Sequence, residues 1–245
     1  MATVKRYKKE DFETYCLGAT VSMEYLNVRP QNVSHVYLHS AFHESDTKAK
    51  ILGICKQHGI PVDTNDKVFS ILSQKENCYV IAMVRKYRCE LDQGASHVVL
   101  VNPSNAGNAG TIIRSAVGFG VPDIAIIRPA VDFFDPKVIR ASMGALSRVN
   151  FKYYDSWESY IGTDGAGNRH LYPFMLDGSK LLHEVTIEKP FSLIMGNEAT
   201  GLPSAFAGIG QPVRIDHGDG IDSLNLPIAT SIGLYEATKG GFEKK

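Results

Sequence analysis

Short apolar runs alternate along this chain with longer stretches that have the spacing of amphipathic helices. In the first part we expect strands at 35–38 and 79–84, helices at 47–58 and 68–72, and an extended segment at 60–62. Gly59 follows the first of these helices, and glycine commonly ends a helix. The pattern predicts a small α/β unit.

The second part repeats the alternation. Strands are predicted at 97–101, 124–128, 149–154, 171–176, 191–195 and 212–216, and helices at about 111–119, 136–146 and 222–237. This order favours an α/β fold with a parallel sheet covered on both faces. Such sheets bind ligands beyond the carboxyl ends of their strands, so the loops that follow strands are where chemistry is expected.

Residues 85–96 are a polar, charged stretch between two apolar strands. Domain boundaries usually fall in stretches of this kind. We therefore predict a smaller N-terminal domain at 1–90 and a C-terminal domain at 97–245.

Composition narrows the classes of protein that fit. With 44% hydrophobic residues among 245 and no long uncharged apolar stretch, we expect a globular cytoplasmic protein without a membrane partner. The four cysteines lack the close pairs typical of zinc sites, so no metal is predicted.

Charge gives only local hints of a nucleic-acid partner. Basic and acidic residues number 26 each; residues 1–90 hold 13 basic and 10 acidic ones, so the balance is +3 there and −3 (13 − 16) in the remainder. The run Lys5, Arg6, Lys8 and Lys9 is either an RNA-steering patch or a solvated arm.

The loop at 102–110 is a glycine-rich turn between a strand and a helix. This arrangement indicates an anion or nucleotide site, because small residues expose backbone N–H groups at the start of a helix. The alternative is a tight turn in which Asn108 only caps the helix. A dinucleotide-dependent oxidoreductase is disfavoured, because the third glycine and the ribose-binding acid are missing and the next strand ends at Arg128 and Pro129.

Two further loops follow predicted strands. The loop at 193–203 leaves its strand through Gly196 and Glu198, and a carboxylate in that position must find a partner or meet solvent. The loop at 213–227 leads into the last helix, and Pro227 fits only a first helical turn, so that helix should begin between 223 and 226. His217 in this loop is expected to face solvent.

Together the three loops resemble the signature motifs of the SpoU family of RNA ribose 2′-O-methyltransferases, within the SPOUT superfamily. The matching residues are Asn108, Gly110 and Arg114 in the first motif, Gly196, Glu198, Gly201 and Leu202 in the second, and Ser223, Leu224 and Asn225 in the third. The resemblance covers about 97–240. The family's Pro-x-Asn form would select Asn105 instead of Asn108, so both asparagines remain candidates. Pro227 stands where many members have a small polar residue.

The resemblance implies a C-terminal domain with a deep trefoil knot, a homodimer, the cofactor S-adenosyl-L-methionine and an RNA substrate, either rRNA or tRNA. Residues 1–90 look like the small α/β substrate-binding domain that many SpoU enzymes carry, akin to ribosomal proteins that bind kinked RNA. An alternative is a non-catalytic RNA-binding or assembly protein on the same fold, which binding of S-adenosylmethionine would distinguish.

Residue roles follow from the same resemblance. The implied cofactor-binding residues are Met195, Gly196, Ile215, Leu224 and Asn225. The implied catalytic residues are Arg114, Asn108 (or Asn105), Glu198 and Asn225. A guanidinium stays protonated in proteins, so we expect Arg114 to orient the ribose and hold phosphate instead of acting as a base.

Overall fold

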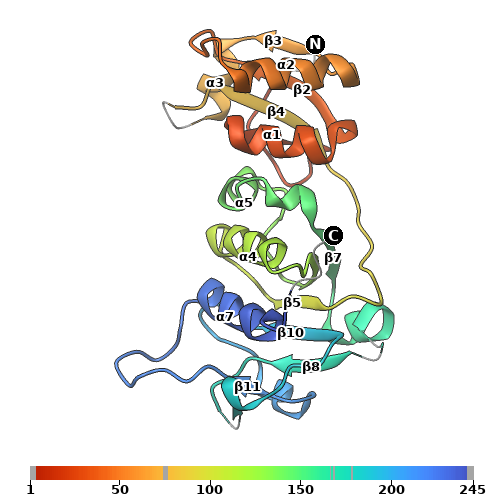
Figure 1. The fold of residues 1–245 in the computed structure, drawn as a ribbon, viewed down its shortest axis with the longest axis vertical. Coiled ribbons are helices and arrows are strands. Elements are labelled where there is room, and N and C mark those ends of the chain that lie inside the picture. Colours follow the sequence, from red (N-terminus) through yellow and green to blue (C-terminus); the bar gives the residue numbers. More distant parts are fainter. Residues whose placement is uncertain (1–3, 74–76, 166, 168, 178, 242–245) are drawn as a thin grey trace. The chain divides into compact units, whose positions relative to one another are not determined.

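The computed structural model of the chain describes residues 4–73, 77–165, 167, 169–177 and 179–241. The chain forms two compact units (Figure 1). The first unit comprises Met1–Tyr87 and Asp132–Arg148, and the second comprises Arg88–Val131 and Val149–Lys245. Residues 132–148, which lie inside the predicted C-terminal domain, thus pack with the first unit.

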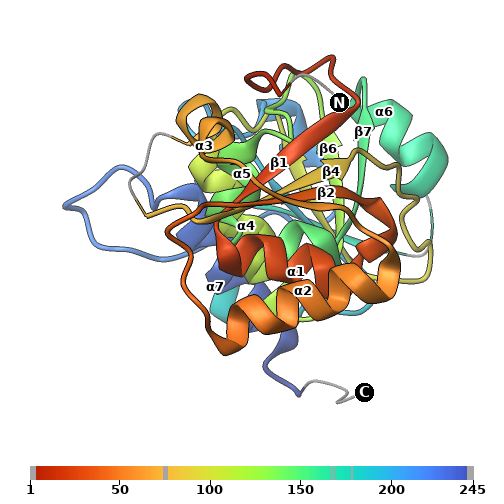
Figure 2. The ribbon, with the colours of Figure 1, turned by 90° about the horizontal axis from the view of Figure 1, so that it is seen from above.

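The first unit is built on a four-stranded sheet in the order β1-β4-β2-β3. Its strands are β1 (Glu13–Leu17), β2 (Val33–Leu38), β3 (Val62–Thr64) and β4 (Val80–Arg85). Its helices are α1 (Ala19–Val28), η1 (Pro30–Asn32), α2 (Asp46–His58) and α3 (Asp66–Leu72). Figure 2 shows α1 and α2 on one side of this sheet and α3 on the other. The α2 helix ends as predicted, with Gly59 at φ 65°. The patterns used above did not predict β1 and α1.

The segment 132–148 was predicted to hold one helix at 136–146, and this prediction is wrong. The structure has α5 (Pro136–Ala141) and a separate turn of 3-10 helix, η2 (Ala145–Arg148). The break lies at Met143 and Gly144, which both have positive φ, 54° and 85°. A Cβ at Gly144 would lie 2.8 Å from Cβ of Glu24 on α1, so this close approach requires glycine.

The second unit has the predicted parallel sheet. Its strand order is β7-β6-β5-β10-β8, and every neighbouring pair is parallel. The strands are β5 (His97–Val101), β6 (Asp123–Ile127), β7 (Asn150–Tyr154), β8 (His170–Pro173) and β10 (Phe191–Met195). The short strands β9 (Lys180–Leu181) and β11 (Val213–Arg214) form a separate pair.

Helices pack on both faces of this sheet. On one face, Val99, Ala125 and Ile194 form a core with Tyr160 of α6 (Trp157–Tyr160) and Phe206 of η5 (Ser204–Gly208). On the other, α7 (Leu226–Thr238) packs against β10, and α4 (Ala106–Gly118) lies beside α7. The remaining short turns are η3 (Ile161–Gly165) and η4 (Leu182–Glu184).

The helices α4 and α7 begin at other residues than the hydrophobic periodicity predicted. The α4 helix starts at Ala106 and not near 111, because the side chain of Asn105 accepts a hydrogen bond from the Asn108 N–H at 3.0 Å and caps the helix. The α7 helix starts at Leu226, so its start lies at the end of the window that Pro227 predicted and not at 222. Within the described ranges, no helix has the length and apolar character needed to cross a bilayer.

Candidate functional site

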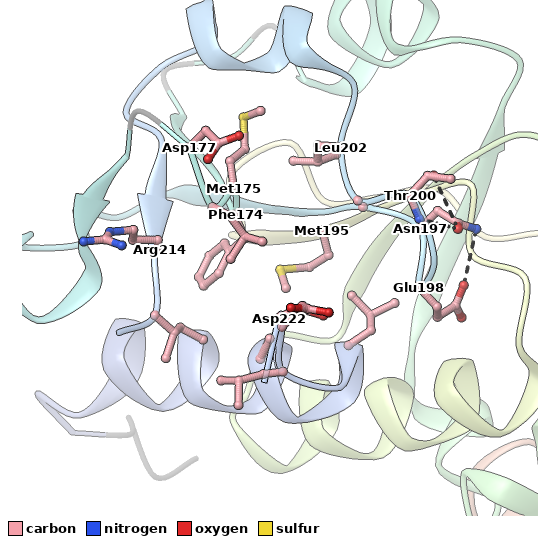
Figure 3. A pocket seen from close by; sticks show the side chains of 18 of the residues that line it. Phe174, Met175, Asp177, Met195, Asn197, Glu198, Thr200, Leu202, Arg214 and Asp222 are labelled. Atoms are coloured by element: carbon pink, nitrogen blue, oxygen red, sulfur yellow. Dashed lines mark hydrogen bonds between the residues drawn. The ribbon is translucent and has the colours of Figure 1, made fainter. Parts of the chain in front are cut away.

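A cavity of about 550 Å³ lies in the second unit beyond the ends of β8, β10 and β11 (Figure 3). Three segments line it. They are the residues after β8 (174–177), the loop after β10 (195–202, with Ser204 and Ala207), and the segment from β11 into α7 (213–215, 217, 222–224, 226 and 229). Two of these segments contain the loops at 193–203 and 213–227, where the sequence analysis predicted chemistry.

The loop after β10 reverses direction within five residues. The N–H of Asn197 donates to the carbonyl of Gly201 at 3.1 Å, and the N–H of Gly201 donates back at 2.9 Å. Gly201 has a φ of 67°, which favours glycine. A Cβ at Gly196 would lie 2.2 Å from the carbonyl carbon of Gly201. The chain's own backbone therefore requires glycine at this position, which the family resemblance assigned to cofactor binding.

Glu198 connects this loop to the loop after β5. Its Oε2 accepts hydrogen bonds from the N–H and the hydroxyl of Ser104 at 3.1 and 2.9 Å. Its Oε1 accepts from the N–H of Asn105 at 3.1 Å and from Nδ2 of Asn108 at 3.3 Å. The carboxylate thus holds together two loops that are more than ninety residues apart in sequence.

The surroundings of Glu198 favour the ionised form of its carboxyl group. Partial burial raises the pKa of its carboxyl, but hydrogen bonds from backbone N–H groups and the Ser104 hydroxyl outweigh burial and lower the pKa below its usual value. The group is therefore ionised at neutral pH. A carboxylate that accepts several N–H bonds next to the first turn of α4 also interacts favourably with the helix dipole.

The two candidate asparagines perform different structural tasks. Asn105 caps α4 with its side chain and offers its N–H to Glu198. Asn108 is inside the first turns of α4 and offers its side-chain amide to the same carboxylate. The alternative in which Asn108 caps the helix is therefore wrong, since Asn105 is the cap.

Asn197, which we did not single out from the sequence, connects the same loops. Its Nδ2 donates to the carbonyl of Asn102 at 2.8 Å, directly after β5. Its Oδ1 accepts from the N–H groups of Ala199 and Thr200 at 2.9 and 3.2 Å. Figure 3 shows Asn197 and Glu198 together at one end of the cavity. The position of Asn197 between two motif residues, Gly196 and Glu198, was the feature of the sequence that could have identified it.

Four of the predicted cofactor-binding residues line the cavity, namely Met195, Gly196, Ile215 and Leu224. The fifth, Asn225, is outside the lining set; it is exposed and precedes α7, where its carbonyl accepts from the N–H of Ala229 at 3.0 Å.

Arg114 is also outside the lining set. It lies on the exposed side of α4 and forms no hydrogen bond or ion pair with any residue that the structure describes. The guanidinium is thus free to meet a partner from outside the chain.

The residues after β8 were missed because the predicted strand was too long. We expected a strand at 171–176, but β8 ends at Pro173, so Phe174, Met175 and Asp177 line the cavity. Phe174 packs against α7 at Gly233, where a Cβ would lie 2.5 Å from the ring. His217, expected to face solvent, also lines the cavity.

The charged groups of the cavity indicate what it can bind. The side chains of Asp177 and Asp222 line it without a hydrogen bond or ion pair to any described residue. Arg214 is the one arginine or lysine among the lining residues of the described chain. The cavity therefore favours a ligand that carries positive charge and an apolar body. Over the same described residues, no three His, Cys, Asp or Glu side chains are grouped to hold a metal ion.

Comparison with known proteins connects this site to a family. The model of the SpoU rRNA Methylase family matches residues 95–235. An uncharacterized tRNA/rRNA methyltransferase of Synechocystis is 29% identical over 143 residues, which are 58% of this chain and 52% of that protein. The 23S rRNA (uridine(2479)-2′-O)-methyltransferase of Streptomyces viridochromogenes is 28% identical over 159 residues, covering 58% of this chain and 52% of the relative. The chain thus spans about half the length of these curated relatives.

Solved structures show the same fold over nearly the whole chain. An AdoMet-bound rRNA methyltransferase from Sinorhizobium meliloti superposes with a TM-score of 0.80 at 24% identity, covering 95% of this chain and 89% of that one. At this level of identity the likeness establishes the fold.

The close reversal at Gly196 leads to a prediction. Gly196→Ala should lower the free energy of unfolding by about 1–3 kcal/mol, because the new methyl group would overlap the backbone of Gly201. Urea denaturation measures the change. The matched control is Gly208→Ala in η5, where nothing lies within 4 Å of the new Cβ, and it should stay within about 0.5 kcal/mol of wild type. Equal stabilities for the two variants would contradict the steric argument.

Proposed function

The chain belongs to the SpoU rRNA methylase family, and from this membership we infer that it transfers a methyl group from S-adenosyl-L-methionine to a ribose 2′-hydroxyl of RNA, either rRNA or tRNA. One observation carries the proposal. The loops that hold the family's second and third motifs line one cavity, and Glu198 of the second motif is bound to the loop that holds the first. The relatives' names as tRNA and rRNA methyltransferases support the same substrate class.

The residues of the cavity fit S-adenosylmethionine. This cofactor, when bound, supplies an electrophilic methyl group on a sulfonium, and its sulfonium and ammonium outnumber its one carboxylate. The backbone at Gly196 and the apolar side chains of Met195, Ile215 and Leu224 would receive the nucleoside. The unpaired carboxylate of Asp222 would face the cationic part of the ligand.

Positioning should supply much of the rate acceleration, because methyl transfer to a hydroxyl depends on aligning the ribose oxygen with the sulfur–methyl bond. Glu198 acts as a positioning residue that fixes the loops at the cavity. Arg114 remains protonated, so we assign it to holding a phosphate or orienting the ribose. The family resemblance also implies catalytic roles for Asn108 and Asn225, and we include both residues in the proposed site.

Two finer features complete the proposed architecture. A deep trefoil knot is implied for the C-terminal domain at 97–245 by the family membership, and the meeting of residues 196–202 with 215, 217 and 222–224 at one cavity supports it. Residues 1–90 are proposed as the domain that binds RNA. The four-stranded α/β unit found there supports this role, and so does its positive charge balance.

We also propose that the protein is a homodimer that pairs through α4 and α7. The α7 helix exposes Ile228, Ile232 and Tyr235, at 53%, 36% and 59%, on one helical stripe. The adjacent α4 helix is joined to it by a hydrogen bond between the hydroxyls of Ser115 and Ser231 at 2.8 Å. Small exposed residues of α4 next to an apolar stripe favour close packing of a second copy.

The dimer proposal predicts that Ile232→Glu shifts the protein toward monomer. A carboxylate buried in an apolar interface is strongly unfavourable, so the dissociation constant should rise at least about 100-fold. Sedimentation velocity over a concentration series measures it. Ile71→Glu is the control, since Ile71 of α3 in the first unit is an isoleucine of similar exposure, 41% against 36%. A wild-type protein that stays monomeric at high micromolar concentration would refute the proposal.

The cavity charge predicts a selective effect of Asp222→Asn. The variant should bind S-adenosylmethionine about 2- to 5-fold more weakly, because a partly solvated carboxylate loses its attraction to a cation. Binding of the product S-adenosylhomocysteine, which keeps the ammonium and the carboxylate but lacks the sulfonium charge, should change less than about 2-fold. Calorimetry with both ligands measures the difference. Asp219→Asn, in the same loop but outside the lining set, is the matched control. Equal losses for both ligands would contradict an attraction between Asp222 and the sulfonium.

The role of Arg114 predicts that Arg114→Ala lowers methyl transfer to RNA at least about 100-fold and changes S-adenosylmethionine affinity less than about 2-fold. Transfer of labelled methyl groups to total RNA from cells lacking the gene measures the first quantity, and calorimetry the second. Arg114→Lys should recover only part of the rate, since lysine lacks the planar fork. A wild-type protein that binds RNA without transferring methyl groups would favour the non-catalytic alternative.

A further inference from the structure

The basic run near the N-terminus is held in a folded turn in the structure. Lys86 donates to the carbonyl of Lys9 at 2.7 Å, and its Nζ lies 4.6 Å from the centre of the Tyr7 ring. The Tyr7 hydroxyl in turn donates to Asp132, and Lys5 pairs with Asp11 at 2.5 Å. All of these residues belong to the first unit. The solvated-arm alternative therefore does not describe residues 4–12.

Phe12 follows this turn directly, and among the described residues it is the most exposed of the large apolar side chains at 90%. The backbone of Phe12 is fixed, because its carbonyl accepts from the N–H of Lys86 at 2.9 Å and β1 begins at the next residue. Phe12 also lines a shallow cavity of about 230 Å³ together with Val4, Tyr15 and Met83. The ring is thus held in place at its base and open to solvent over most of its surface.

Three cations of the same turn have no partner among the described residues. The side chains of Arg6, Lys8 and Lys9 are exposed and form no ion pair or hydrogen bond with any described residue. Lys5 is neutralised by Asp11, and Glu10 is the other acidic residue between 5 and 12, so the turn carries a net charge of +2 (4 basic − 2 acidic). The exposed aromatic ring of Phe12 thus belongs to a segment that carries a net positive charge.

This combination fits one kind of partner. The face of an unpaired nucleobase stacks on an aromatic ring regardless of its sequence, and neighbouring phosphates bind lysine and arginine. A base-paired helix hides the faces of its bases, so the ring selects looped or single-stranded RNA. A turn that is already ordered loses little conformational entropy on binding.

We propose that residues 6–12 form a contact for unpaired RNA, in which Phe12 stacks on a base and Arg6, Lys8 and Lys9 bind the flanking phosphates. The inference rests on the proposed RNA substrate, and it adds where and how the first unit holds RNA. It assigns stacking to one residue and charge neutralisation to three others, so the two contributions can be separated.

The test uses the full-length protein and two labelled probes of about twelve nucleotides, an oligoadenylate and an abasic oligoribonucleotide with the same number of phosphates. Fluorescence anisotropy gives both dissociation constants. Phe12→Ala should weaken binding of the oligoadenylate roughly 5- to 100-fold and of the abasic probe less than about 2-fold, because only the former offers base faces. Phe12→Trp should restore binding of the oligoadenylate.

The charge contribution is tested with the double variant Lys8→Gln and Lys9→Gln. It should weaken binding of both probes and reduce the slope of log affinity against log salt by about 1.4, since each phosphate contact on a single strand contributes about 0.7. Lys50→Gln is the matched control, because Lys50 is an exposed lysine of α2 in the same unit without an ion pair to any described residue. It should change the slope by less than about half as much.

Three results would overturn the inference: no effect of Phe12→Ala on either probe, an equal loss on both probes, or an altered sedimentation coefficient with unchanged RNA binding, which would make the turn a protein contact. S-adenosylmethionine binding and methyl transfer by the wild-type protein are measured in parallel. If they are present while Phe12→Ala has no effect, the RNA contact fails and the proposed function stands. If wild-type protein binds neither probe nor cofactor, the proposed function itself fails.

Discussion

The carboxylate of Glu198 is the interaction on which the geometry of this site depends. It lies just beyond a buried strand and accepts hydrogen bonds from two residues before α4 and from one within its first turns. Hydrogen bonds to a charged group contribute about 1.5–3 kcal/mol each, roughly twice the value between neutral partners. Several such bonds converge on one side chain, so the loop after β10 and the loop after β5 are effectively one structural unit.

Glu198 reaches the loop after β5 only because the loop that carries it, the one after β10, is tight. The reversal between Asn197 and Gly201 brings backbone against backbone at Gly196, at a distance where no side chain fits. Asn197 then uses its own side chain to hold the turn closed and to reach the end of β5. Glycines that look like ligand contacts in a motif are here needed first for the folding of the loop itself.

The distribution of charge bears on the proposed function, because a chain with equal numbers of basic and acidic residues would have to bind both a cationic cofactor and a polyanion. Asp177 and Asp222 line the cavity without an ion pair to any described residue, and their carboxylates favour a cationic small molecule and disfavour a polyanion. In the proposed function, attraction to RNA would therefore come from cations outside the cavity that have no ion pair with a described residue, namely Arg114 on α4 and the cations of the turn at 6–12. The segment 132–148 also ties the first unit together, since Phe134 accepts from Thr14 and Ser147 accepts from Arg29. A truncation at residue 90 would remove these partners of a segment that remains.

Local sequence determined much about this protein. Periodicity and turn residues predicted the parallel sheet, the cap at Gly59 and the window for the start of α7, and the motif residues predicted four of the residues that line the cavity. These features depend on neighbours within one turn or one strand. The lining by Phe174 and Asp177, the bonds of Asn197 and Asn105 to a distant loop, and the close approach of Gly144 to α1 depended on contacts between distant segments. The early start of α4 is a local feature, the cap at Asn105, which periodicity alone did not detect. Only the tertiary structure decided them, because a hydrogen bond such as that from Ser104 to Glu198 spans more than ninety residues and leaves no periodic trace in the sequence.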